Sequence, residues 1–128
     1  MARIMVVDDA LFMRQMLANI LKAEGHEICA EASTAKEAVE KYKQFKPDLV
    51  TMDIVMPMIE EMDGIGAVEE IMKFDPNAKI LIISVMAQHA LVLKAMQAGA
   101  KDFVVKPFKP SRLIAAINHI LSSGEKQK

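Results

Sequence analysis

The sequence predicts an α/β fold, in which five short strands alternate with five helices around a parallel sheet. Short, almost continuous apolar runs rich in β-branched residues alternate with longer segments whose apolar residues recur at the helical period. Apolar runs of this kind are typical of parallel strands that are covered on both faces. The alternation extends over most of the 128 residues, which is the length of one domain.

The five predicted strands are short, and a helical segment separates each one from the next. They comprise Ile4–Val7, Ile28–Ala32, Leu49–Met52, Ile80–Ile83 and Phe103–Val105. Each pair of successive strands is therefore joined by a helical crossover, which is right-handed in nearly all known cases. Five strands connected in this way favour a doubly wound, flavodoxin-like sheet with the strand order 2-1-3-4-5.

The helical segments carry recognisable boundary signals. The second begins with Thr34-Ala35-Lys36-Glu37, a capping-box pattern. The fourth has an apolar stripe of Val92, Ala95 and Met96. Residues 1–122 then form one domain, and residues 123–128 form a short polar tail. The other boundary residues are Gly25 after the first helix, Gly64 before the third, Gly99 after the fourth and Pro110 at the start of the fifth.

Composition and charge exclude several classes of protein. Hydrophobic residues make up 52% of the chain and the formal net charge is −1, so there is no basic excess for binding a nucleic-acid backbone. No apolar run approaches the roughly 20 residues of a membrane span. Asp8 and Asp9 follow the first apolar run too early for a signal peptide, and Cys29, the single cysteine, cannot form an internal disulfide. We therefore expect a cytoplasmic monomer that binds neither nucleic acid nor membrane.

Polar residues follow four of the five predicted strands. The first strand ends in Asp8 and Asp9, the third in Asp53, the fourth in Ser84 and the fifth in Lys106. Each residue alone has an ordinary interpretation as a helix cap, a turn residue or a solvated lysine. The carboxyl ends of parallel strands meet at one edge of the sheet, however, so these residues are expected to lie together. Three adjacent carboxylates repel one another unless a cation neutralises them.

The residue types favour Mg²⁺ and phosphoryl transfer. Carboxylate and carbonyl oxygens suit Mg²⁺, while His26, His89 and His119 are too scattered to form a zinc site. An aspartate can act as a nucleophile and form an acyl phosphate, a reaction that depends mainly on positioning and charge stabilisation. Asp53 is the predicted phosphoacceptor, with Lys106 supplying charge and Ser84 a hydrogen bond.

Five motifs in order resemble the receiver domain of two-component response regulators, and among these the stand-alone chemotaxis regulators. They are VVDDALFMR, VTMDIVMP, IISVMAQ, AGAKDFVVKPF and KPSRL, and they span nearly the whole chain. The resemblance implies that Asp9 and Asp53 ligate Mg²⁺ directly, together with the backbone carbonyl of Val55. Asp8 would act mostly through water.

The resemblance also implies a switch. Lys106 would contact a phosphoryl oxygen, and the Lys106–Pro107 peptide is expected to be cis. Ser84 would move to bond the phosphoryl group, and Phe103 would turn inward afterwards. The protein would then be a phosphoacceptor that assists its own phosphorylation and dephosphorylation and is not a conventional enzyme.

The same resemblance implies two partners. The phosphoryl donor would be a phosphohistidine on a histidine kinase of the CheA kind. The target would be a motor switch or adaptor protein that binds the surface of the fourth helix, the fifth strand and the fifth helix. The fourth helix has more apolar residues than one buried face needs, because Leu91 and Leu93 flank Val92. We therefore assign some of these residues to the partner surface.

Three features depart from the family pattern. The loop after Pro57 has about three extra residues within residues 58–62, a length change that surface loops tolerate. Val85 follows Ser84 where the family usually has a smaller residue, so we expect narrower access to the site. Phe103 replaces a tyrosine that many chemotaxis regulators carry.

Three other functions remain as alternatives. A phosphorelay intermediate would use the same site. A Mg²⁺-dependent phosphohydrolase needs a second acid two positions after its nucleophile, where this sequence has the apolar Val55. A flavodoxin-like cofactor binder needs a phosphate-binding first turn, where Asp8 and Asp9 would repel phosphate.

Overall fold

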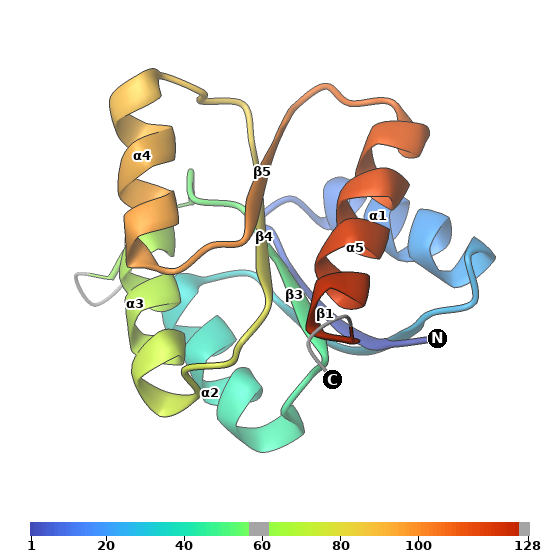
Figure 1. The fold of residues 1–128 in the computed structure, drawn as a ribbon, viewed down its shortest axis with the longest axis horizontal. Coiled ribbons are helices and arrows are strands. Elements are labelled where there is room, and N and C mark those ends of the chain that lie inside the picture. Colours follow the sequence, from blue (N-terminus) through green and yellow to red (C-terminus); the bar gives the residue numbers. More distant parts are fainter. Residues whose placement is uncertain (57–61, 126–128) are drawn as a thin grey trace.

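Five parallel strands and five helices alternate along the part of the chain that the computed structural model describes, residues 1–56 and 62–125 (Figure 1). The strands are β1 (Arg3–Val7), β2 (Glu27–Ala32), β3 (Leu49–Met52), β4 (Ile80–Ser84) and β5 (Asp102–Val105). The helices are α1 (Leu11–Ala23), α2 (Ala35–Phe45), α3 (Gly64–Phe74), α4 (His89–Ala98) and α5 (Pro110–Glu125). Each predicted strand is present, because a short apolar run between helical segments has few other ways to bury its side chains.

The strands form one sheet in the order β2-β1-β3-β4-β5, and all the pairings are parallel. This order confirms the predicted flavodoxin-like topology. The first strand has β2 on one side and β3 on the other, so Val7 lies beside both Ala32 and Met52. The carboxyl ends of β1 and β3 are therefore immediate neighbours.

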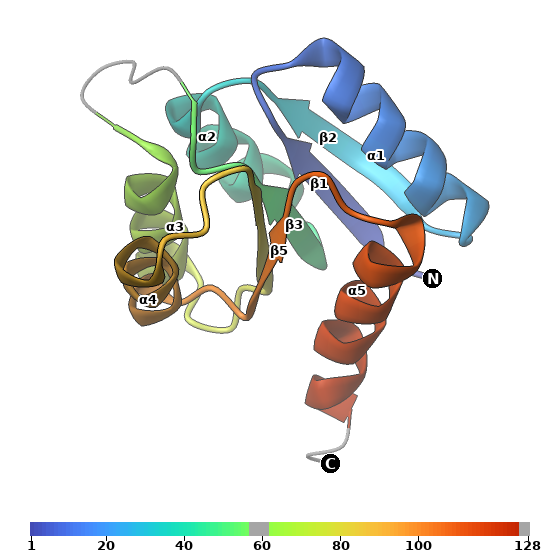
Figure 2. The ribbon, with the colours of Figure 1, turned by 90° about the horizontal axis from the view of Figure 1, so that it is seen from above.

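Helices cover both faces of the sheet (Figure 2). Side chains of β1 alternate between the faces: Met5 and Val7 pack in a core with α2, α3 and α4, whereas Ile4 and Val6 pack in a second core with α1 and α5. Each core contains fully buried aliphatic side chains. The sheet is thus a rigid base from which the loops at its carboxyl edge project.

Several helix ends follow the signals in the sequence. Thr34 Oγ1 accepts a hydrogen bond from the Glu37 amide at 3.1 Å. The Glu37 carboxylate bonds the amide of Ser33 at 2.7 Å, one residue before the cap, so the predicted capping box is slightly shifted. Gly99 has a φ of +127°, and a Cβ there would lie 2.6 Å from Met72 Cγ, so glycine also allows close packing against α3.

Helix α4 departs from the predicted stripe. Ala95 is buried, but Met96 is exposed and Leu91 packs against the core in its place. Leu93 is 48% exposed. The helix is therefore rotated relative to the sequence expectation, because its apolar residues nearly encircle it and the α3 contact selects the buried side.

Helix α5 extends to Glu125, three residues into the segment assigned to a polar tail. The helical hydrogen bonds continue because each added residue gains a bond once the helix exists. Residues 126–128 lie outside the described part of the chain. Among the described helices, none is long and apolar enough to cross a membrane.

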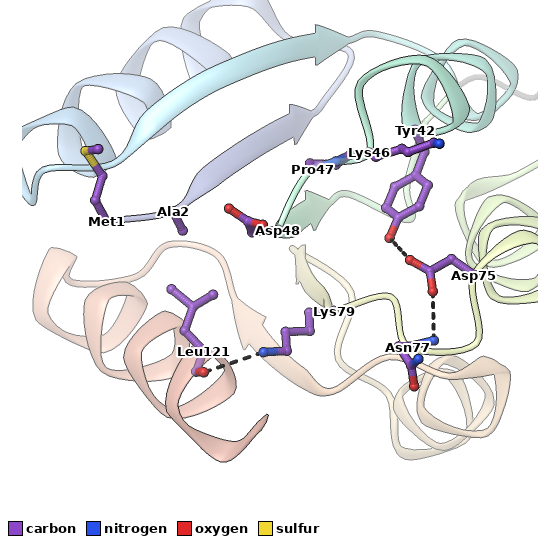
Figure 3. A pocket seen from close by; sticks show the side chains of 10 residues that line it. All are labelled: Met1, Ala2, Tyr42, Lys46, Pro47, Asp48, Asp75, Asn77, Lys79 and Leu121. Carbon is purple, nitrogen blue, oxygen red and sulfur yellow. Dashed lines mark hydrogen bonds between the residues drawn. The ribbon is translucent and has the colours of Figure 1, made fainter. Parts of the chain in front are cut away.

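A hollow of about 630 Å³ lies at the amino ends of strands β1, β3 and β4 (Figure 3). The Tyr42 hydroxyl donates to Asp75 Oδ2 at 2.8 Å, and the Asn77 amide donates to Asp75 Oδ1 at 3.0 Å. Burial, and then the hydrogen bond to Asp75, raises the pKa of Tyr42. These bonds connect α2 to the loop between α3 and β4, which gives this edge a structural role.

Candidate functional site

Three aspartates lie together at the carboxyl ends of the strands. Asp8 follows β1 and is 1% exposed, and Asp53 follows β3 and is 6% exposed. Asp9 is exposed at the start of the turn to α1. One carboxylate oxygen from each of the three lies within 4.8 Å of the others. The pairing of β1 with β3 produces this arrangement, because it places the residues after both strands side by side.

Lys106 lies between the two buried carboxylates. It follows β5, and its Nζ donates to Asp8 Oδ2 at 2.6 Å and to Asp53 Oδ2 at 3.0 Å. Burial is the largest influence on this ammonium and by itself lowers the pKa of Lys106. The hydrogen bonds and charges of both aspartates outweigh burial, so the pKa of Lys106 is raised overall. The lysine therefore remains charged and partly neutralises the acidic group.

Asp53 is held at both carboxylate oxygens. Its Oδ1 accepts the Val55 amide at 2.8 Å and its Oδ2 accepts Lys106, while its own amide donates to Val7 O at 3.0 Å. Burial raises the pKa of Asp53, with a smaller contribution from the Asp8 charge, and the bonds from Val55 and Lys106 only partly offset it. The folded environment therefore disfavours the ionised form of Asp53, mainly because the carboxyl group is buried.

The donor set fits a hard divalent cation. Three carboxylates converge, and the exposed one, Asp9, makes no hydrogen bond within the described part of the chain. Oxygen ligands with room for water are the preference of Mg²⁺. A cation here would also favour the ionised form of Asp53.

Ser84 and Lys106 are linked through the backbone. Ser84 ends β4 and is completely buried, and its Oγ accepts the Met86 amide at 3.3 Å. The Lys106 amide donates to Ser84 O at 2.9 Å, which continues the pairing of β4 with β5. The Lys106–Pro107 peptide is cis, the isomer that the family resemblance implies.

Phe103 is half-buried on β5 and packs against the core of α2, α3 and α4. It also lines a hollow of about 430 Å³ together with Phe108 and Arg112. Arg112 Nη2 donates to Phe103 O at 3.2 Å. The aromatic ring thus lies between the core and an open depression on the β5–α5 surface.

The departures from the family pattern lie around this edge. Val85, the residue after Ser84, is exposed, as is Val55. The inserted residues fall largely outside the described part of the chain, which omits residues 57–61. The loop resumes at Met62, and the Asp63 side chain caps α3 by accepting the Gly66 amide at 2.7 Å.

Two residues, Gly64 and Arg14, contact the site although the sequence patterns did not assign them to it. A Cβ on Gly64 would lie 2.5 Å from Ile54 Cα and 2.8 Å from Asp53 O, so α3 begins directly against the backbone of Asp53. Arg14 Nη1 donates to the carbonyl oxygen of Asp8 at 2.7 Å. Arg14 lies within the DDALFMR motif, which is the signal that could have pointed to it.

The fold and this group of residues are those of a phosphoacceptor domain of the response-regulator class. The model of the response regulator receiver domain matches residues 4–118, and the chain belongs to this family. It is 58% identical over 118 residues to the chemotaxis protein CheY of Thermotoga maritima, with 92% of this chain and 96% of that protein covered. It is 54% identical over 120 residues to CheY of Bacillus subtilis, covering 94% and 98% of the two chains.

A solved structure gives the same result. A chain of the crystal structure of the CheX–CheY–BeF₃–Mg²⁺ complex from Borrelia burgdorferi superposes with a TM-score of 0.87 at 37% identity, over 92% of this chain and 87% of that one. The chain is therefore a CheY-like receiver domain, a signalling protein and not a conventional enzyme.

Proposed function

We propose that this chain is a chemotaxis response regulator that accepts a phosphoryl group on Asp53 with Mg²⁺ bound beside it. The observation that carries the proposal is the convergence of Asp8, Asp9 and Asp53, with Lys106 donating to the two buried acids. Asp9, Asp53 and the Val55 carbonyl would hold the ion directly, and Asp8 mostly through water.

Phosphorylation requires one bond to form and one to break. An Asp53 oxygen attacks phosphorus while the bond to the donor nitrogen of a phosphohistidine breaks, and the leaving imidazole takes the electron pair. Bound Mg²⁺ would neutralise charge on the phosphoryl oxygens. Lys106 exchanges its 3.0 Å bond to Asp53 for a bond to a phosphoryl oxygen, so its charge remains at the site throughout.

The signal would pass from Ser84 to Phe103. The Ser84 hydroxyl, which now accepts the Met86 amide, would turn to the phosphoryl group. Phe103 would move from its half-buried position further into the core, which changes the surface formed by α4, β5 and α5. Of the two leucines, Leu93 is exposed on that surface and is the one we assign to the partner contact, whereas Leu91 is partly buried against the core.

The proposed partners are those that the family resemblance implies. A histidine kinase of the CheA kind would be the donor, and a motor switch or adaptor protein would be the target, with the protein acting in the cytoplasm. The Borrelia burgdorferi structure is a complex of CheX with a CheY, which supports a chemotaxis partner in general. Val55 stands where a phosphohydrolase would need its second acid, so nothing at the site favours that alternative.

Incubation with acetyl phosphate and Mg²⁺, followed by intact-protein mass measurement, tests the proposal. We expect the mass of the wild type to increase by one phosphoryl group, and we expect no increase in Asp53→Ala or with excess EDTA. Asp48→Ala, at the opposite edge of the sheet, is the control and should label normally. Labelling of Asp53→Ala, or turnover of phosphomonoesters without labelling of the wild type, would refute the proposal.

A further inference from the structure

The turn between β1 and α1 carries two of the three carboxylates, and its backbone is held from three directions. The Asp8 amide donates to Ala32 O of β2 at 3.0 Å. The Asp8 carboxylate accepts the Ala10 amide at 2.9 Å. The Asp8 carbonyl accepts Arg14 Nη1 at 2.7 Å, and this is the bond that a side chain of α1 contributes. Arg14 therefore acts on the peptide group between the two acids.

That peptide group determines where Asp9 lies. A peptide unit is planar, so fixing the Asp8 carbonyl also fixes the direction in which the chain leaves toward the Asp9 Cα. The Asp9 side chain is exposed and has no hydrogen bond of its own within residues 1–56 and 62–125. Its position relative to Asp53 consequently depends on the backbone that Arg14 holds.

Glu31 in turn orients the guanidinium. Arg14 Nε donates to Glu31 Oε1 at 3.1 Å, and the Arg14 side chain is only 16% exposed. Glu31 lies on β2 beside Val6 of β1, so its position is set by the sheet. The planar guanidinium of Arg14, a residue of α1, thus bonds both the turn that carries Asp8 and Asp9 and the β2 residue Glu31. A lysine cannot make these two hydrogen bonds in the same geometry.

We propose that Arg14 is a positioning residue that, held by Glu31, sets the Asp8–Asp9 peptide so that Asp9 reaches the same cation as Asp53. This inference rests on the proposed Mg²⁺ site. Positioning and charge have opposite consequences here. A guanidinium beside the site repels a divalent cation, so if charge alone mattered, neutralising Arg14 would strengthen Mg²⁺ binding. If Arg14 positions Asp9, neutralising it weakens binding.

The test is Mg²⁺ binding to the metal-free protein without a phosphodonor, measured by isothermal titration calorimetry. We expect Arg14→Met and the charge-conserving Arg14→Lys both to bind Mg²⁺ about 10-fold more weakly or worse, the usual effect of losing a residue that orients a metal ligand. Lys22→Met, an exposed basic residue of the same helix, is the control for charge.

A second measurement separates positioning from general damage. Because the defect is in metal affinity, saturating Mg²⁺ should restore the acetyl phosphate labelling rate of Arg14→Lys to near the wild-type value. Unchanged or tighter Mg²⁺ binding by both Arg14 variants overturns the inference, and so does a labelling defect that saturating Mg²⁺ does not repair. Absence of Mg²⁺ binding by the wild type would instead overturn the proposed function.

Discussion

Replacing Lys106 by methionine should destabilise the metal-free protein strongly. The lysine donates to two carboxylates that are almost completely buried, at 2.6 Å and 3.0 Å. Methionine preserves much of the side-chain volume but leaves Asp8 and Asp53 facing each other without a cation. Removing one partner from a buried ion pair costs about 3 to 5 kcal/mol, and we expect a loss of about that size in the free energy of unfolding.

The loss depends on pH in a defined direction. Burial already raises the pKa of Asp53 in the folded protein. Between the pKa of the unfolded chain and this raised pKa, the folded chain therefore holds a proton on Asp53 that the unfolded chain has released. The free energy of unfolding consequently falls as pH rises through this range. Without Lys106 the pKa of Asp53 rises further. The deficit of Lys106→Met is therefore largest near neutral pH and shrinks as pH falls and the Asp53 carboxylate becomes protonated. The pKa of Lys106 is itself raised, so the wild-type lysine keeps its contribution until alkaline pH.

Urea unfolding in EDTA and in Mg²⁺, at neutral and at acidic pH, measures these effects. Mg²⁺ should raise the unfolding midpoint more in Lys106→Met than in the wild type, because the ion replaces the lost charge. Lys109→Met is the control, since Lys109 is exposed in the same segment and its loss should change stability by no more than about 0.5 kcal/mol. If Lys106→Met matched this control at neutral pH in EDTA, the buried-charge reasoning would be wrong.

Two further predictions concern single side chains. Thr51 Oγ1 is buried with no hydrogen-bond partner in the described part of the chain, so Thr51→Val should raise the free energy of unfolding by about 1 to 2 kcal/mol, as measured by urea denaturation. Thr51→Ser keeps the hydroxyl and should not stabilise the protein. A destabilised Thr51→Val would contradict the argument. Leu93→Glu should weaken binding to the chemotaxis target in calorimetry while leaving Asp53 labelling and stability unchanged, because Leu93 is exposed. Leu91→Glu should lower stability by roughly 2 kcal/mol or more, because it buries a charge against the core; equal effects of the two variants would show that α4 is placed differently.

Most of the fold could be predicted because it depends on local pattern and on simple rules of connection. Short, largely apolar runs such as Leu49–Met52, placed between helical segments, favour buried strands. Thr34 and Asp63 act as caps because their side chains bond backbone amides within the same turn. Five strands joined by right-handed crossovers favour the observed strand order, which places Asp8 next to Asp53.

Other features of the site could not be predicted in this way. The contact of Gly64 with the Asp53 carbonyl depends on the angle at which α3 meets the sheet. The burial of Leu91 in place of Met96 depends on how α4 is rotated, which its nearly uniform apolar surface does not specify.

By itself the sequence determined the residue types of the site and the edge of the sheet where they gather, because strand ends and helix caps are encoded within a few residues. Only the tertiary structure decided that Lys106 would bond both Asp8 and Asp53, and that Arg14 would hold the peptide before Asp9. Lys106 is 98 residues from Asp8 in the chain. Whether such groups come within hydrogen-bonding distance depends on the exact packing of strands and helices. A local sequence pattern does not contain that information.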